Sequence, residues 1–179
     1  MRYHQAFDPK AFFDALGDPL SATWIYLVPA MWDRVLDYAK AHPNLRAAKP
    51  WQRLRIIRSA GAELPHDVAM ELSDLFGDAV TILPTYAMTE AMPIASPPLS
   101  YHLDHPGSVG RVLPTVSVEI IDPTDAALPP VANGIVGEIT VKGAMVFDGY
   151  DEGCEPSSKS FTSRGYFRTG DLGRFSADG

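Results

Sequence analysis

The feature that most limits the fold of this sequence is a buried-strand pattern followed by a turn and an amphipathic helix pattern, which occurs twice. In the first copy, residues 23–28 (TWIYLV) are almost all apolar, and Pro29 ends the run. Continuous apolarity without alternation is typical of a strand buried on both faces of a parallel sheet. Residues 31–41 then place apolar side chains at helical spacing, and a short helix is also predicted upstream, over 9–17.

The second copy begins at residues 54–58 (LRIIR) and continues through small residues at 59–63. A helix pattern covers 65–76, with a proline at its start and a glycine after its end. A third strand, in AVTILPTYAMTE, breaks at Pro84. Strands that alternate with helices pair in parallel, so the sequence predicts an α/β layer. Ligands of such sheets bind at the carboxyl ends of strands, where SAGAELP and PTYAMTE both lie.

The pattern changes after the two prolines at 97 and 98. Short β-branched runs separated by Gly, Pro, Asp and Asn occur in SVGRVLPTVSVEIID, GIVGEITVKG and YFRTGDLGRFS, and no helical period lies between them. These runs predict antiparallel β structure. We therefore divide the chain into an α/β domain over 1–98 and a β-rich domain over 99–179, with DEGCEPSSKS as a loop.

Composition and charge argue against several classes of function. The formal charge is −7 and no stretch clusters lysine and arginine, so nucleic acid is not an expected partner. No apolar run reaches the roughly 20 residues of a membrane-spanning helix, and the start lacks a secretory signal. We expect an intracellular, cytoplasmic protein, and a peroxisomal or membrane-associated parent stays open. Cys154 has no partner for an internal disulfide, and His102 and His105 have no further ligand at metal-binding spacing.

Five short motifs follow one another along the chain. They are SAGAELP (59–65), YAMTE (86–90), GSVGR followed by VEIID, GEITVKGAMVFDGY, and GYFRTGDLGRF. Taken alone, SAGAELP also fits helix packing, YAMTE a helix cap, and RTGD a solvated β-turn. In this order and spacing they closely resemble the large domain of the adenylate-forming (AMP-binding) enzymes, which include acyl-CoA synthetases and the adenylation domains of nonribosomal peptide synthetases. The resemblance covers nearly the whole chain.

The resemblance implies an acid-thiol ligase. Such an enzyme joins a carboxylate to the α-phosphate of ATP, releases pyrophosphate, and passes the acyl group of the acyl-AMP to a thiol of CoA or of a carrier-protein phosphopantetheine. It also implies ATP or AMP and Mg²⁺ as ligands. The site residues implied at matching positions are Thr89 and Glu90 for catalysis, Glu90 for the metal, and Gly61, Ala62, Glu63, Tyr86, Ala87, Met88 and Asp171 for the nucleotide.

The residue types suit these implied roles. Small residues at 61–62 let a purine approach the backbone, and Tyr86 offers an aromatic wall. Thr89 offers a hydroxyl to phosphate oxygens, and Glu90 offers a carboxylate to Mg²⁺, which prefers oxygen ligands. Asp171 can accept hydrogen bonds from both ribose hydroxyls.

The sequence also departs from the family pattern. Ala60 and Ala87 stand where glycine is common, so the backbone there is expected to avoid positive φ. Met88, in place of a proline, favours the acyl-ligase branch. The family's phosphate-loop lysine and carboxyl-terminal catalytic lysine have no counterpart here. We therefore expect a middle fragment of a larger ligase, inactive by itself because a cationic partner for the α-phosphate is missing, and able to self-associate.

One alternative comes from a different class of function. The chain could be a non-catalytic interaction or antigenic module that keeps an adenylation fold within a larger multidomain protein. A phosphate-loop lysine in the parent would favour the ligase, and its absence would favour the module. A serine hydrolase is not indicated, because the sequence has no G-x-S-x-G elbow.

Overall fold

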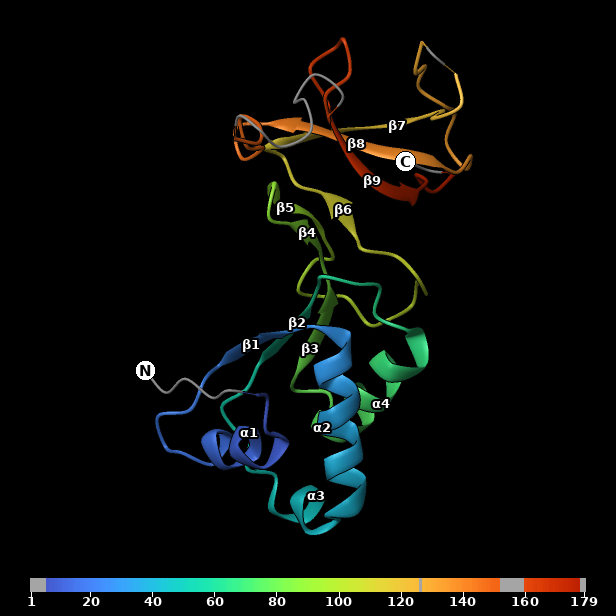
Figure 1. Ribbon diagram of the computed structural model, residues 1–179. Coiled ribbons are helices and arrows are strands. Elements are labelled where there is room, and N and C mark those ends of the chain that lie inside the picture. The colour runs from blue at the N-terminus through green and yellow to red at the C-terminus, as the bar shows by residue number, and fades with distance from the viewer. Residues whose placement is uncertain (1–5, 126, 152–159, 178–179) are drawn as a thin grey trace. The chain divides into compact units, whose positions relative to one another are not determined.

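The computed structural model describes residues 6–125, 127–151 and 160–177, and Cys154 lies outside this part of the chain. The elements, labelled in Figure 1, are α1 (Pro9–Leu16), β1 (Trp24–Leu27), α2 (Pro29–Ala41), α3 (Asn44–Ala48), β2 (Ile56–Ser59), α4 (His66–Phe76), β3 (Thr81–Pro84), β4 (Tyr86–Met88), β5 (Ala91–Ser96), β6 (Arg111–Val112), β7 (Val116–Ile121), β8 (Gly137–Gly143) and β9 (Phe167–Gly173).

The chain forms two compact units. Unit 1 comprises Met1–Tyr86 and Ala95–Arg111, and unit 2 comprises Ala87–Ile94 and Val112–Gly179. The chain passes from one unit to the other within β4, β5 and β6, which form a three-stranded sheet in the order β4-β5-β6. None of the helices among the described residues has both the length and the apolar character that crossing a bilayer requires.

Unit 1 is built on a parallel sheet in the order β1-β2-β3. Leu27 pairs with Ser59, and Ser59 pairs with Pro84, so the three strands end at the same edge of the sheet. The α/β prediction with parallel pairing is therefore confirmed. The two crossovers, through α2 and α4, also lie where the sequence predicted them.

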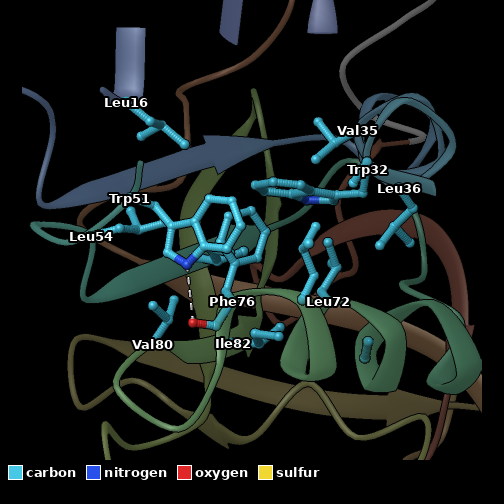
Figure 2. Close-up of a cluster of buried hydrophobic side chains, with 14 of the residues drawn as sticks. Leu16, Trp32, Val35, Leu36, Trp51, Leu54, Leu72, Phe76, Val80 and Ile82 are labelled. Atoms are coloured by element: carbon cyan, nitrogen blue, oxygen red, sulfur yellow. Dashed lines mark hydrogen bonds between the residues drawn. The ribbon is translucent and has the colours of Figure 1, made fainter. Parts of the chain in front are cut away.

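The core of unit 1 lies between this sheet and its helices. The most deeply buried side chains, each 0% exposed, are those of Trp32, Val35, Leu54, Ile57 and Leu72. Figure 2 shows the rings and branched side chains of this cluster turned toward one another from helices, strands and the segment before β2. Burying each such side chain contributes about 1.5 to 3 kcal/mol, so this cluster supplies most of the driving force for folding unit 1.

The helix ends follow from local sequence. Asp8 caps α1 by accepting a hydrogen bond from the Lys10 amide at 2.9 Å. α4 begins one residue later than predicted, since Pro65 is its N-cap, and it ends at Gly77, whose φ of 79° favours glycine. The five-residue α3 was not predicted, because so short a segment shows no helical period.

One prediction for unit 1 is wrong. β1 is not buried on both faces: Trp24 is 58% exposed and Tyr26 45% exposed, while Ile25 and Leu27 pack against the core. β1 is an edge strand of its sheet, and the helices of the unit cover the face that Ile25 and Leu27 share. Aromatic side chains occupy the other face, so the apolar run looks continuous although only alternate residues pack against the core.

Unit 2 contains an antiparallel sheet in the order β7-β8-β9. Its buried side chains include Ile121, Thr140, Val141 and Phe167. The Thr140 hydroxyl donates to the backbone oxygen of Glu119 at 3.0 Å, which satisfies a polar group in this core. The predicted antiparallel β structure is confirmed, and β8 and β9 lose their register between Glu138 and Thr140.

Candidate functional site

In unit 1 the structure brings two of the predicted site segments to one edge of the parallel sheet. The loop that contains Gly61, Ala62 and Glu63 follows β2, and Tyr86 follows β3 after a single residue. The Ser59 backbone oxygen accepts a hydrogen bond from the Thr85 amide at 2.8 Å, so the two segments leave the sheet side by side. This edge is where parallel sheets bind ligands.

The small-residue loop after β2 contains a glycine with positive φ. Gly61 has a φ of 89°, and a Cβ added there would lie 3.2 Å from Val28 Cγ1. Gly61, Ala62 and Glu63 are exposed. Ala60 and Ala87 are not among the residues with positive φ, which confirms the expectation for those two alanines.

Polar side chains under this edge hold the strand ends in place. Arg58 Nη1 donates to the hydroxyls of Thr85 at 3.1 Å and Ser96 at 2.9 Å. Ser59, which is 1% exposed, has a hydroxyl without a hydrogen-bond partner among the described residues. A surface pocket of unit 1 lies elsewhere, between residues 16–21 and 48–53, and none of the predicted site residues lines it.

In unit 2, Thr89 and Glu90 form the turn between β4 and β5. The Thr89 side chain is exposed, and Ala87, Met88 and Glu90 are partly buried. The Glu90 carboxylate accepts a hydrogen bond from the Tyr150 hydroxyl at 3.0 Å. This contact raises the pKa of the Tyr150 phenol above its ordinary value, because the hydrogen bond and charge of Glu90 favour the neutral phenol.

Asp171 also belongs to unit 2, near the end of β9, where it is exposed. Its amide donates to the Thr169 hydroxyl at 3.1 Å, and that hydroxyl donates to the backbone oxygen of Ile139 at 2.8 Å. Gly170, with a φ of 77°, supplies the conformation that this irregular part of the strand needs. The RTGD segment is therefore part of a strand with a local irregularity, and its backbone is fixed by neighbouring groups.

A buried ion pair supports this segment. The Glu138 side chain, 7% exposed, accepts hydrogen bonds from Arg168 Nε at 3.0 Å and from Arg168 Nη2 at 2.5 Å. The same carboxylate lies 3.4 Å from the Gly170 amide, which donates to it. The Glu138 hydrogen bond and charge raise the pKa of the Arg168 guanidinium, which stays protonated.

Sequence reasoning did not single out Tyr150, Glu138 or Arg168. Glu138 could have been found from the sequence, because it lies between glycine and β-branched residues in a predicted strand. A carboxylate that is buried there needs a polar or charged partner. Tyr150 carries no such signal, since its contact with Glu90 joins positions 60 residues apart.

Comparison with known proteins identifies the family. A family model for AMP-binding enzymes matches residues 1–151. The chain is 35% identical over 175 residues to an oxalate-CoA ligase of Saccharomyces cerevisiae, covering 97% of this chain and 30% of that protein. It is 34% identical over 155 residues to a malonate-CoA ligase of Arabidopsis thaliana, covering 85% of this chain and 24% of that protein.

A solved structure agrees with this family. The ATP-bound crystal structure of MatB from Rhodopseudomonas palustris superposes with a TM-score of 0.82 and 33% identity, covering 99% of this chain and 33% of that one. The chain thus spans about a third, or less, of the length of these relatives. Because the match extends over most of its residues, the chain belongs to the adenylate-forming AMP-binding enzyme family, and its relatives include CoA ligases.

Proposed function

We propose that this chain supplies nucleotide-binding segments of the large domain of an ATP-dependent acyl-adenylate-forming ligase. The observation that carries the proposal is the identity of 35% with an oxalate-CoA ligase across 97% of the chain. The reaction proposed for the whole protein joins a carboxylate oxygen to the α-phosphorus of ATP and breaks the bond to pyrophosphate. A thiol of CoA or of a carrier protein then takes the acyl group and releases AMP.

In this proposal the adenine contacts two segments, 61–63 and 86–88. The exposed backbone at Gly61, Ala62 and Glu63 lies against the purine, and Tyr86 supplies its aromatic wall. Ala87 and Met88 continue the same lining. Gly61 supports this role, because its exposed backbone carries no side chain and an added Cβ would lie 3.2 Å from Val28 Cγ1.

The residues proposed for the phosphates and the sugar are Thr89 and Asp171. Thr89, whose hydroxyl is exposed at a turn, donates to phosphate oxygens. Asp171 accepts hydrogen bonds from the ribose hydroxyls, and hydrogen bonds of its own amide and of the Gly170 amide hold the backbone that carries it. Preorganised groups of this kind stabilise a bound state without reordering at the moment of binding.

Glu90 fits a role as a magnesium ligand. Mg²⁺ prefers oxygen donors and usually takes one or two carboxylates together with substrate phosphates. Among the described residues no group of three or more His, Cys, Asp or Glu side chains is arranged to hold an ion. When bound, the ion would neutralise charge on the phosphates.

The proposal is tested by ATP–pyrophosphate exchange with the whole protein and a panel of carboxylates that includes oxalate, malonate and medium-chain fatty acids. Exchange with one of them, lost in Glu90→Gln, is the expected result. A protein that binds no nucleotide and exchanges with no carboxylate would contradict the ligase and favour a non-catalytic module. Product analysis with CoA or a carrier protein then identifies the acceptor thiol.

We propose that the isolated chain does not catalyse exchange, since it spans about a third of the length of its relatives. Loss of ligand contacts worth about 4 kcal/mol would change a micromolar affinity for nucleotide to a millimolar one. Exchange by the isolated chain above the level without enzyme would refute this point and leave the proposal for the whole protein intact.

A further inference from the structure

We propose that Tyr150 is a positioning residue that fixes the Glu90 carboxylate for the metal-bound triphosphate. The inference rests on the proposed function, in which Glu90 binds Mg²⁺. Its basis is the hydrogen bond of 3.0 Å from the Tyr150 hydroxyl to Glu90 Oε1, within unit 2. Tyr150 would act through Glu90 and would not itself contact the reacting atoms.

The backbone at Glu90 is held by the same loop that carries Tyr150. The Phe147 amide donates to the Glu90 backbone oxygen at 2.8 Å. The next residue, Ala91, forms an antiparallel bridge with Val146. The loop after β8 therefore fixes both the main chain and the side chain of Glu90, so the contact of Tyr150 is part of a continuous pairing rather than an isolated surface hydrogen bond.

Apolar packing holds this loop in turn. The Phe147 ring lies edge-on to the Tyr150 ring at 4.7 Å and to the Phe167 ring at 5.0 Å, and it stacks with Phe161 at 6.1 Å. Phe167 is buried at the start of β9, four residues before Asp171. One connected set of contacts therefore links the proposed metal carboxylate to the strand that carries the proposed ribose carboxylate.

The chemistry of a phenol suits this task. A neutral hydroxyl that donates to one carboxylate oxygen leaves the negative charge of Glu90 available to a cation through its second oxygen. A lysine or arginine at the same place would bring a positive charge that competes with the metal. Outer partners of metal-binding carboxylates commonly orient them, and removing such a partner weakens metal binding.

The alternative is that Tyr150 only supports the loop. A supporting role predicts that Tyr150→Phe, which keeps the ring against Phe147, has no effect on the metal. A positioning role predicts a change that appears in the metal dependence and disappears when Glu90 is absent. These two roles are separable in one set of variants.

The experiment uses the whole protein, with Mg²⁺-dependent ATP–pyrophosphate exchange and Mn²⁺ binding in the presence of ATP by electron paramagnetic resonance. Tyr150→Phe is expected to raise the Mg²⁺ concentration for half-maximal exchange about tenfold, to weaken Mn²⁺ binding by a similar factor, and to leave the KM of the carboxylate unchanged. The control is Tyr166→Phe, because the Tyr166 hydroxyl pairs with Ser117 at 2.9 Å in the same unit. Tyr166→Phe is expected to change neither the Mg²⁺ concentration for half-maximal exchange nor the Mn²⁺ binding.

The Glu90→Gln and Glu90→Gln/Tyr150→Phe variants complete the set, and equal Mn²⁺ binding by these two variants supports the inference. An unchanged metal dependence in Tyr150→Phe overturns it, as does an effect of Tyr150→Phe that is equally large without the Glu90 carboxylate. A wild-type protein that exchanges with no carboxylate overturns the proposed function itself, so the two failures are distinguished.

Discussion

Arg168 on β9 donates to both carboxylate oxygens of Glu138 on β8, from Nε to Oε1 at 3.2 Å and from Nη2 to Oε2 at 2.5 Å, and the Glu138 side chain is only 7% exposed. This pair joins the two strands where their register changes, next to the segment that carries Asp171. Two parallel hydrogen bonds from a guanidinium fix geometry as well as charge. The shape of this part of unit 2 therefore depends on a buried charge that needs its partner.

Replacing Arg168 with methionine is expected to destabilise unit 2 by about 2 kcal/mol, because the buried Glu138 carboxylate loses its counter-ion. The cost is no larger because the Arg168 guanidinium is partly solvated in the native pair. Hydrogen exchange of the β8 and β9 amides measures the effect. The matched control is Arg164→Met, since the Arg164 pair with Glu119 is more exposed, and it is expected to cost less than about 1 kcal/mol. Equal effects would contradict a special role for the buried pair.

Gly110, in the GSVGR motif, cannot be replaced without moving the backbone. Its φ is 83°, and an added Cβ would lie 2.1 Å from the Pro97 nitrogen. Gly110→Ala is expected to cost more than about 3 kcal/mol, from strain and from the clash. Gly134→Ala is the control, because Gly134 has a φ of 84° but no atom within 4 Å of the added Cβ.

Only the strain of the left-handed conformation, about 1 kcal/mol, is expected for Gly134→Ala. Urea unfolding of both variants separates the two contributions. Similar costs for the two variants would show that the backbone near Pro97 yields to the new methyl group, contrary to the close approach seen in unit 1.

Ser59 is expected to tolerate alanine. Its buried hydroxyl has no partner in the described part of the chain, so Ser59→Ala removes an unsatisfied polar group and leaves the free energy of unfolding unchanged or raises it by about 1 kcal/mol. Thr85→Val is the contrasting variant, because the Thr85 hydroxyl accepts from Arg58 and donates to the Leu83 oxygen at 3.2 Å. It is expected to lower stability by about 1 to 2 kcal/mol. A destabilising Ser59→Ala would indicate a partner for that hydroxyl.

Asp122, after β7, gives a pH-dependent prediction. The hydroxyl and amide of Thr124 donate to it at 2.6 Å and 2.8 Å, and these hydrogen bonds lower the pKa of its carboxyl, the side-chain bond most. A lowered pKa in the folded state gives stability that is present above the unfolded pKa and is lost as the pH falls through the folded one. Thr124→Val is therefore expected to raise the Asp122 pKa toward its ordinary value.

Carbon-13 NMR of the Asp122 carboxyl through the acid range measures this shift. Ser117→Ala, which removes a hydroxyl that pairs with Tyr166 instead, serves as the control and is expected to leave the titration of Asp122 unchanged. An identical titration in Thr124→Val would show that the short contact to the Thr124 hydroxyl does not hold in solution.

Elements with a repeating pattern could be predicted from sequence. The strand at Ile56–Ser59 and the helix at His66–Phe76 were found because apolar side chains recur at the spacing of the element and proline and glycine mark its ends. β5, Ala91–Ser96, was missed because Pro93 interrupts the pattern of a strand. The five residues of α3 are too few to show a period.

Partners of side chains could not be predicted in this way. Glu90 was selected because it lies in the YAMTE motif that resembles the family's, but its contact with Tyr150 depends on pairing between segments 60 residues apart. The exposure of Trp24 and Tyr26 was missed for the same reason, since an edge strand and a central strand can have the same apolar composition. Sequence periodicity reports local geometry, and long-range pairing decides which faces and groups meet.

Asp171 gives the most direct test of the proposed nucleotide site. If its carboxylate accepts from both ribose hydroxyls, at about 1 kcal/mol each for an exposed group, the whole protein prefers ATP to 2′,3′-dideoxy-ATP by about thirtyfold in pyrophosphate exchange. Asp171→Ala is expected to lose ATP affinity and this preference together, because neither nucleotide then has a partner at that position. Asp125→Ala, on the turn after β7, is expected to keep the preference. A preference that survives in Asp171→Ala would assign ribose recognition to another residue. The Asp171 carboxylate of the unmodified protein would then not contact the sugar, although the backbone around it is fixed.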